Sequence, residues 1–355
     1  MKRRSMKSYL LFVAVLFTIG SLCSAAEPIV SLDFDEARGT SVFRKTRQVK
    51  QQQADGVLRL ELTGRDPRLY LREMVEGPVR LQMRMRSGQG TFGRMEIFWR
   101  HEDEEEYTAN KAAMYPVTHD MEWREYDFGL PIKDGPSEIR IDPGWKEGVF
   151  EIDWLRIVPD PLDDKYCRAI ETLPENVTIE DDTLSVTFQG PEERLTITDK
   201  RTERDWFLDL EETQAYLIGL EKQNDNAIRF TILDQSRRSV YTSNMTVQPG
   251  GILHFDLETP DKEEQFWALR NWPPRIKSEF ENGRLIFCDR SSGTLIDQQD
   301  TYYSDRDLAV YGNTRCTDMP WVGMIEWESG DGVMTLAETP TDAVFSFITQ
   351  EDNKL

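Results

Sequence analysis

Strict alternation of apolar and polar residues recurs along the chain and predicts β-strands. The clearest case is the segment 79–86, Val-Arg-Leu-Gln-Met-Arg-Met-Arg, in which every second side chain is apolar. Successive side chains of a strand point to opposite faces, so this pattern places one face in a core and the other in solvent. Similar short segments recur between turns at 56–62, 94–99, 138–142 and 149–157. Repeated short strands without a helical period predict an antiparallel sandwich or jelly roll.

A change in composition divides the chain into two β-rich parts. The segment 159–164, Pro-Asp-Pro-Leu-Asp-Asp, predicts a boundary, and residues 165–173 could form two helical turns before Pro174. Alternating strand segments resume after residue 177. We therefore expect an all-β protein. After the N-terminal segment it should have a jelly-roll module at 27–158, a linker with a short helix at 159–176, and a second β-sandwich at 177–355.

The N-terminal segment 1–26 has the features of a secretory signal peptide. Four basic residues precede a short apolar run at 9–19, and Ser24-Ala25-Ala26 supplies small residues for cleavage. An uncleaved anchor is the alternative, but the run is short for a bilayer span and small residues follow it directly. The sequence therefore predicts a secreted or periplasmic chain that begins near Glu27 and has no membrane contact after cleavage.

The charge of the chain argues against nucleic acid as a partner. The formal net charge is −21, and loss of the four basic residues of the signal would take it to −25. A protein this acidic repels phosphate backbones.

Cysteine and histidine usage does not indicate a zinc site. Cys167, Cys288 and Cys316 remain after the signal, and the three histidines are widely spaced. An odd number of cysteines leaves at least one thiol unpaired. Cys288 and Cys316 could pair, whereas buried free thiols are the alternative.

The most distinctive sequence segments of the chain lie near the C-terminus. The segments 319–327, Met-Pro-Trp-Val-Gly-Met-Ile-Glu-Trp, and 332–343, Gly-Val-Met-Thr-Leu-Ala-Glu-Thr-Pro-Thr-Asp-Ala, follow Trp-Pro-Pro-Arg at 272–275. In this order they resemble the galactose-mutarotase-like sandwich that precedes the catalytic barrel of large secreted bacterial glycoside hydrolases. The nearest group is the endo-α-N-acetylgalactosaminidases of family 101 and their relatives, and the resemblance covers most of 177–348. It implies a supporting sandwich, incomplete at its C-terminal end, whose expected partner is a C-terminal catalytic barrel missing from this sequence.

Catalysis by this chain alone is not predicted. Glycosidases need two carboxyl groups at a fixed separation, and no pair stands out among the abundant acids, Glu326 and Glu328 included. A sugar epimerase of related fold needs histidines, and the second part offers only His254, which alternates with apolar residues on a predicted strand. We therefore expect a non-catalytic carbohydrate-binding and scaffold portion of a glycoside hydrolase. A stand-alone periplasmic or surface interaction protein is the alternative, and a small epimerase or lyase is a weaker one.

The first part offers candidates for sugar contacts. Its segments 116–126, 139–144 and 151–156 resemble accessory jelly-roll modules, which are compared with galactose-binding-like and carbohydrate-binding folds. Sugars stack on aromatic faces while polar side chains fix their hydroxyls. The candidate residues are Trp145, Tyr107, Trp99, Tyr115 and Trp123. Trp145 is the preferred anchor because its Pro-Gly-Trp-Lys-Glu-Gly loop has no packing reason to hold an indole.

Two further expectations concern buried residues and metal. Trp123 and Trp154 lie in strand-like segments, so we expect them in the core. Asp33 and Asp35 belong to the first strand and Asp153 to the last, and these strands can meet in jelly-roll modules. Their carboxylates would suit a structural Ca²⁺ ion, with solvated strand-edge acids as the alternative.

Overall fold

The computed structural model describes most of the chain from residue 27 onward. The described residues are 27–35, 43–88, 94–108, 111–133, 135–190, 192–210, 214–258, 272, 276–277, 282–289, 292–297, 306–309, 317–336 and 344–347. The predicted signal peptide and the proposed partner of Cys288, Cys316, lie outside these residues. None of the helices in the described part is long and apolar enough to cross a membrane.

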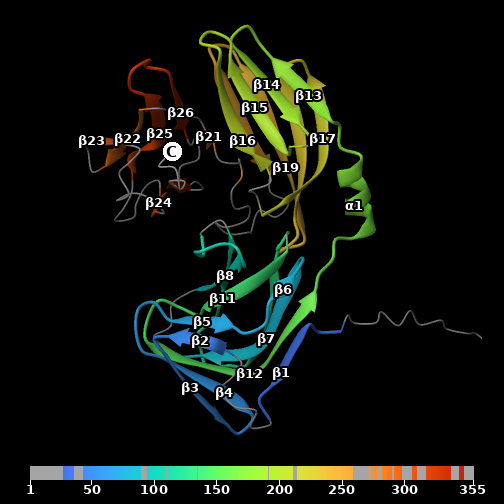
Figure 1. Ribbon diagram of the computed structural model, residues 1–355, viewed down its shortest axis with the longest axis vertical. Coiled ribbons are helices and arrows are strands. Elements are labelled where there is room, and N and C mark those ends of the chain that lie inside the picture. Colours follow the sequence, from blue (N-terminus) through green and yellow to red (C-terminus); the bar gives the residue numbers. More distant parts are fainter. Residues whose placement is uncertain are drawn as a thin grey trace, which may run out of the picture.

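The first part is a sandwich of two antiparallel sheets (Figure 1). Sheet 1 has the order β10-β7-β12-β4-β3, with β1 beside β12. Its strands are β1 (Val30–Asp33), β3 (Val49–Ala54), β4 (Val57–Leu62), β7 (Val79–Ser87), β10 (Arg124–Leu130) and β12 (Gly148–Pro159). Sheet 2 has the order β2-β5-β11-β8-β9, with β6 beside β11. Its strands are β2 (Phe43–Arg47), β5 (Arg68–Leu71), β6 (Val75–Glu76), β8 (Arg94–His101), β9 (Ala112–Pro116) and β11 (Pro136–Asp142).

Apolar and polar residues alternate along the strands, and the apolar side chains of both sheets form a single core between them. The apolar residues of the segment 79–86 are at most 1% exposed, which confirms the predicted half-buried strand. Ile139 and Ile141 of β11 and Ile97 of β8 face the same core from sheet 2. The residues between them, Arg140 among them, therefore point to the outer side of sheet 2.

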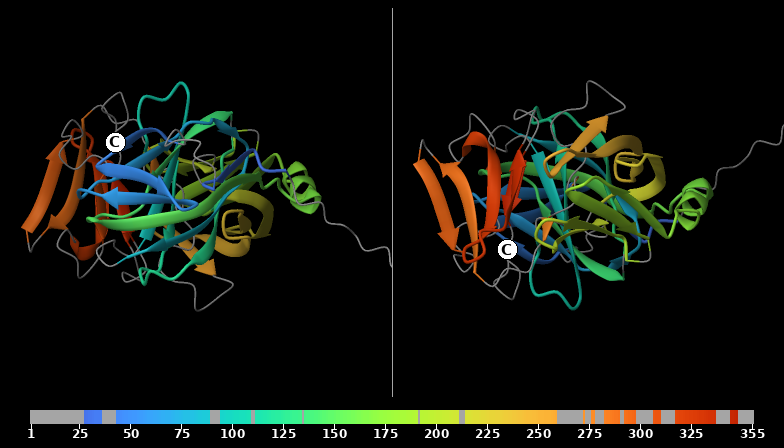
Figure 2. Two further views of the ribbon diagram at one scale, coloured as in Figure 1. Left: turned by 90° about the horizontal axis from the view of Figure 1, so that it is seen from below. Right: turned by 90° about the horizontal axis from the view of Figure 1, so that it is seen from above.

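A short helix connects the two sandwiches, as predicted. Helix α1 (Asp164–Glu171) buries none of its side chains, and Cys167 on it is an exposed free thiol. Figures 1 and 2 show α1 on the opposite side of the molecule from the strands β22 to β26.

The second part is also built of antiparallel sheets. A five-stranded sheet has the order β13-β14-β15-β16-β21, and a four-stranded sheet runs from β17 to β20 in chain order. The bounds are β13 (Asn176–Glu180), β14 (Leu184–Gln189), β15 (Arg194–Asp199), β16 (Arg204–Asp209), β17 (Tyr216–Asn224), β18 (Ala227–Asp234), β19 (Ser239–Gln248), β20 (Ile252–Glu258) and β21 (Ile276–Lys277). Both sheets contribute to one core, with Phe188 and Phe230 fully buried.

The remaining strands form two smaller sheets. One has the order β23-β22-β25-β26, and β24 pairs with β27 in the other. The bounds are β22 (Gly283–Asp289), β23 (Ser292–Asp297), β24 (Arg306–Ala309), β25 (Thr317–Glu326), β26 (Gly332–Leu336) and β27 (Val344–Phe347). Met324 and Val333 pack against the core of the second sandwich. The predicted all-β fold class is therefore confirmed.

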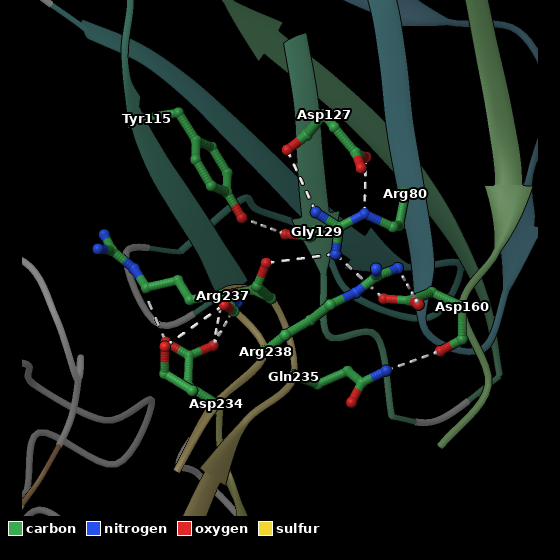
Figure 3. Close-up of polar contacts among 11 residues, drawn as sticks. Arg80, Tyr115, Asp127, Gly129, Asp160, Asp234, Gln235, Arg237 and Arg238 are labelled. Carbon is green, nitrogen blue, oxygen red and sulfur yellow. Dashed lines mark hydrogen bonds and ion pairs between the residues drawn. The ribbon is translucent and has the colours of Figure 1, made fainter. Parts of the chain in front are cut away.

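The turn between β18 and β19, residues 235–238, lies against the outer side of sheet 1 (Figure 3). Arg80 of β7 donates to Asp127 at 2.6 Å and to Asp160 at 3.2 Å, and its third contact is the carbonyl of Ser236 at 3.4 Å. Asp160 also accepts a hydrogen bond from Arg238 at 3.2 Å. The two sandwiches thus share a charge network beside the linker, in which Arg80 and Asp160 are buried.

Candidate functional site

A row of four side chains crosses the middle of the outer face of sheet 2. In the strand register Lys45 lies opposite Tyr70, Tyr70 opposite Arg140, and Arg140 opposite Phe98. We call these four residues the central row. Tyr70 and Phe98 are half-buried and Lys45 is exposed. Antiparallel pairing therefore brings four segments that are distant in sequence into one aromatic and cationic strip.

Arg140 is the most constrained residue of the central row. Its guanidinium carbon lies 3.9 Å from the ring centre of Phe98 and 4.8 Å from that of Tyr107. Its Nε and Nη2 donate to the two carboxylate oxygens of Asp142 at 2.9 and 3.0 Å. Two parallel hydrogen bonds fix the plane of the guanidinium. Arg140 is only 7% exposed, although it is on the outer side of the sheet.

Tyr107 reaches the central row from the connection between β8 and β9. Its ring centre is 5.9 Å from that of Tyr70, with the planes inclined by 58°. Its hydroxyl donates to Glu138 at 3.2 Å, and the Arg100 guanidinium lies 5.1 Å from its ring centre. Burial and the Glu138 carboxylate raise the pKa of Tyr107 to about 12, so the phenol stays protonated. The ring is thus held beside Tyr70 as a second aromatic face.

Two carboxyl groups of this surface, those of Asp142 and Glu138, have pKa values that are shifted in opposite directions. Burial raises the pKa of Asp142 to about 6, against the opposing effect of Arg140, and the Glu96 carboxylate adds to the rise. Burial acts in the same direction on Glu138, but hydrogen bonds from Arg44 and Arg100 outweigh it and lower the pKa of Glu138. Glu138 is therefore ionised at neutral pH, whereas Asp142 changes its charge in mildly acidic solution.

Trp145 lies in the loop after β11, near the end of the same face. It is 43% exposed, and the Arg94 guanidinium lies 4.3 Å from its ring centre. Arg94 in turn pairs with Glu96 at 3.0 Å, and Glu96 lies opposite Asp142 in the sheet. The predicted exposure of Trp145 is confirmed, while its role in binding stays a prediction.

Two of the predicted sugar contacts are wrong in this structure. Trp99 is 3% exposed and belongs to the core, because it shares the inward face of β8 with Ile97. Tyr115 packs its ring 4.9 Å from Phe128, and its hydroxyl donates to the Gly129 carbonyl at 2.5 Å. Burial raises the pKa of Tyr115 to about 12. Both rings thus pack towards the core of the sandwich and not onto the outer face of sheet 2.

Trp123 and Trp154 are not in the core, contrary to expectation. Both are half-buried on the outer side of sheet 1, where Arg86 lies 4.6 Å from the ring centre of Trp123 and Arg156 lies 4.8 Å from that of Trp154. A bulge in β12 between Ile152 and Trp154 shifts the register against β7. The extra residue reverses the alternation, so Ile152 points inward and Trp154 outward.

The predicted calcium site does not form. The first and last strands meet as expected, with Asp33 opposite Trp154. However, Asp153 forms an ion pair with Arg84, and Asp33 and Asp35 are exposed. Within the described ranges, no group of three or more His, Cys, Asp or Glu side chains could hold a metal ion. Asp33 and Asp35 are exposed, as the alternative of solvated strand-edge acids expects, whereas Asp153 is ion-paired.

Comparison with known proteins gives only distant likeness. No protein-family model and no curated protein sequence matches the chain. Among solved structures, the xylan-binding CBM22-1 domain of Xyn10C from Paenibacillus barcinonensis is 18% identical, with a TM-score of 0.28 over 38% of this chain and 95% of that one. The C-terminal CBM6 of LamC from Zobellia galactanivorans is 12% identical, with a TM-score of 0.27 over 36% and 98%. A carbohydrate-binding module of Cellvibrio mixtus lichenase 5A, in complex with cellotriose, is 12% identical, with a TM-score of 0.25 over 37% and 98%. These values are too low to transfer a function, which has to follow from the residues of the surface itself.

Proposed function

We propose that this chain binds a carbohydrate on the outer face of sheet 2. The supporting observation is that Arg140 is fixed between aromatic rings on an outward-facing strand surface. Sugar rings present C–H faces that pack on aromatic side chains, and hydroxyls that need oriented donors and acceptors. The central row and Tyr107 supply both kinds of contact.

The side chains of this surface are preorganised in the absence of a ligand. Tyr107 is held by its bond to Glu138 and Arg140 by its two bonds to Asp142. Side chains that are already ordered lose little conformational entropy on binding, which leaves more of the contact energy for affinity. The surface is nevertheless a sheet face, so we expect weak affinity and contacts with several consecutive sugar units.

In the wider proposal, the chain is an exported, non-catalytic binding and scaffold portion of a glycoside hydrolase. The signal-like segment 1–26 and the C-terminal segments that resemble a mutarotase-like sandwich support this proposal. An interaction protein without sugar specificity remains the second candidate, and a failure to bind any glycan would favour it.

Substitution of the two tyrosines tests the proposal. Tyr70→Ala and Tyr107→Ala should each weaken glycan binding about tenfold, which corresponds to the loss of one aromatic stacking contact. Trp123→Ala is the matched control, because Trp123 is also a half-buried aromatic residue stacked on arginine but lies on the outer side of sheet 1. Glycan arrays followed by titration calorimetry of each variant measure the effect, and thermal melting verifies folding. Folded tyrosine variants that bind like the wild type would contradict the proposal.

A further inference from the structure

The strands of sheet 2 carry an excess of positive charge in a strongly acidic protein. The formal net charge of the chain is −21. The six strands of sheet 2 nevertheless hold seven cationic residues and four carboxylates, whereas those of sheet 1 hold seven and six. The cations of sheet 2 are Arg44, Lys45, Arg47, Arg68, Arg94, Arg100 and Arg140, and the carboxylates are Glu76, Glu96, Glu138 and Asp142.

The carboxylates near β2 are each shared between two cations. Glu138 accepts from both Arg44 and Arg100. Asp66, in the turn before β5, pairs with both Arg47 at 3.3 Å and Arg68 at 2.9 Å. One carboxylate neutralises one guanidinium, so each of these groups keeps a net positive charge.

Lys45 adds a charge that no described residue neutralises. Among the described residues it forms no ion pair, and its ammonium lies 5.6 Å from the ring centre of Tyr70. Strand β2 is at the edge of sheet 2, and the side chains of Arg44 and Arg47 are 43% and 53% exposed. A ligand that stacked on Tyr70 would therefore meet Lys45 directly, with two further exposed cations on the same strand.

The acidic run 102–106 lies between β8 and Tyr107, on the β8 side of the central row. Arg100 donates to the backbone carbonyls of Glu104 and Glu105 at 2.8 and 2.5 Å, and the Tyr107 ring that follows lies 5.9 Å from that of Tyr70. Glu104 in this run is paired with Lys111. The run therefore offsets positive charge beside Arg100 and Tyr107. The positive excess of this face is carried at the β2 side by Lys45 and by Arg47 and Arg68, which share Asp66.

We infer that the carbohydrate bound on sheet 2 is an anionic polysaccharide, with its carboxylate or sulfate groups beside Lys45 and the β2 arginines and its sugar ring on Tyr70. This inference rests on the proposed function. A chain of this net charge repels a polyanion at long range, and only a local positive surface can offset that repulsion. Guanidinium forks and ammonium groups are the donors that bind carboxylate and sulfate oxygens most strongly.

The test compares three ligands on the whole chain. Oligogalacturonate carries carboxylates, sulfated dextran oligosaccharides carry sulfates, and xylohexaose is neutral. We expect one or both anionic ligands to bind at least about tenfold more tightly than xylohexaose. Their affinity should fall when the salt rises from about 0.02 M to about 0.5 M, because added salt screens exposed charges. The ratio between the two anionic ligands identifies which group the surface prefers.

Two lysine variants test whether the preference for anionic ligands arises at Lys45. Lys45→Gln should weaken anionic binding about fivefold, as expected for one exposed charge contact, and so lower the ratio of anionic to xylohexaose affinity. Lys50→Gln is the control, since Lys50 is an exposed lysine of sheet 1 that pairs with Glu61 at 3.3 Å. Equal losses in both variants would overturn the inference.

The remaining outcomes separate the inference from the proposed function. If xylohexaose binds as tightly as the charged ligands, the surface binds sugars but the inference fails. If polyglutamate binds as well as oligogalacturonate and Tyr70→Ala has no effect, the attraction is merely electrostatic and the inference also fails. If none of the glycans binds, the proposed function itself is wrong.

Discussion

Gly129 of β10 allows the two sandwiches to approach one another closely. A Cβ atom at this position would lie 2.5 Å from both the Cα and the carbonyl oxygen of Ser236. These are backbone atoms, so the neighbouring turn cannot yield by rotating a side chain. The Gly129→Ala variant must therefore move the turn 235–238 away from sheet 1.

The expected loss of stability follows from what the turn contacts. Overpacking of a well-packed site costs about 1–3 kcal/mol. Displacement of the turn also breaks the contacts from Gln235 and Arg238 to Asp160, for which we assume about 1 kcal/mol each. We therefore expect Gly129→Ala to lower the free energy of unfolding by about 3–5 kcal/mol.

Urea denaturation and limited trypsin digestion measure this effect. Cleavage after Lys165 or Arg168 in α1 should become faster, because the linker would no longer be held beside a docked interface. The control is Gly323→Ala, where the nearest atom to an added Cβ would be the Val333 carbonyl oxygen at an ordinary 3.5 Å. Unchanged stability and unchanged cleavage in Gly129→Ala would refute the reasoning.

Two further predictions concern the proposed binding surface. The pKa of Asp142 is about 6 in the folded protein and about 4 in the unfolded chain, so its contribution to stability is present below pH ~4 and is lost as the pH rises through 6. Urea midpoints between pH 4 and 7 should therefore show a decline in the wild type that is smaller in Asp142→Asn, and equal slopes would contradict this assignment. Trp145→Ala should remove glycan binding while the melting temperature stays nearly constant, because the indole is exposed. Unfolding of that variant would instead make Trp145 a structural residue.

Sequence patterns predicted the strands well but the surface only in part. Apolar alternation located β7 and its buried face, and the same rule applied to Ile139-Arg140-Ile141 would have placed Arg140 outward. The partnership of Arg140 with Tyr70 could not be predicted, because it depends on a strand register set by distant residues. Trp99 follows Phe98 directly. Because both residues are aromatic, the apolar alternation does not indicate which of the two side chains points into the core. The outward orientation of the Trp154 side chain depends on a β-bulge that has no signature in the local sequence.

The charge network at Asp160 has a consequence for the order of folding. Arg80 meets its partner Asp160 after 80 residues of chain, but its contact with Ser236 spans 156 residues. Domains generally fold as units during synthesis, starting from the N-terminus. Arg80 and Asp160 can therefore pair as soon as β12 is complete, long before the turn 235–238 has been made. The first sandwich would emerge with a neutralised docking site, and the second would attach to a surface that is already formed.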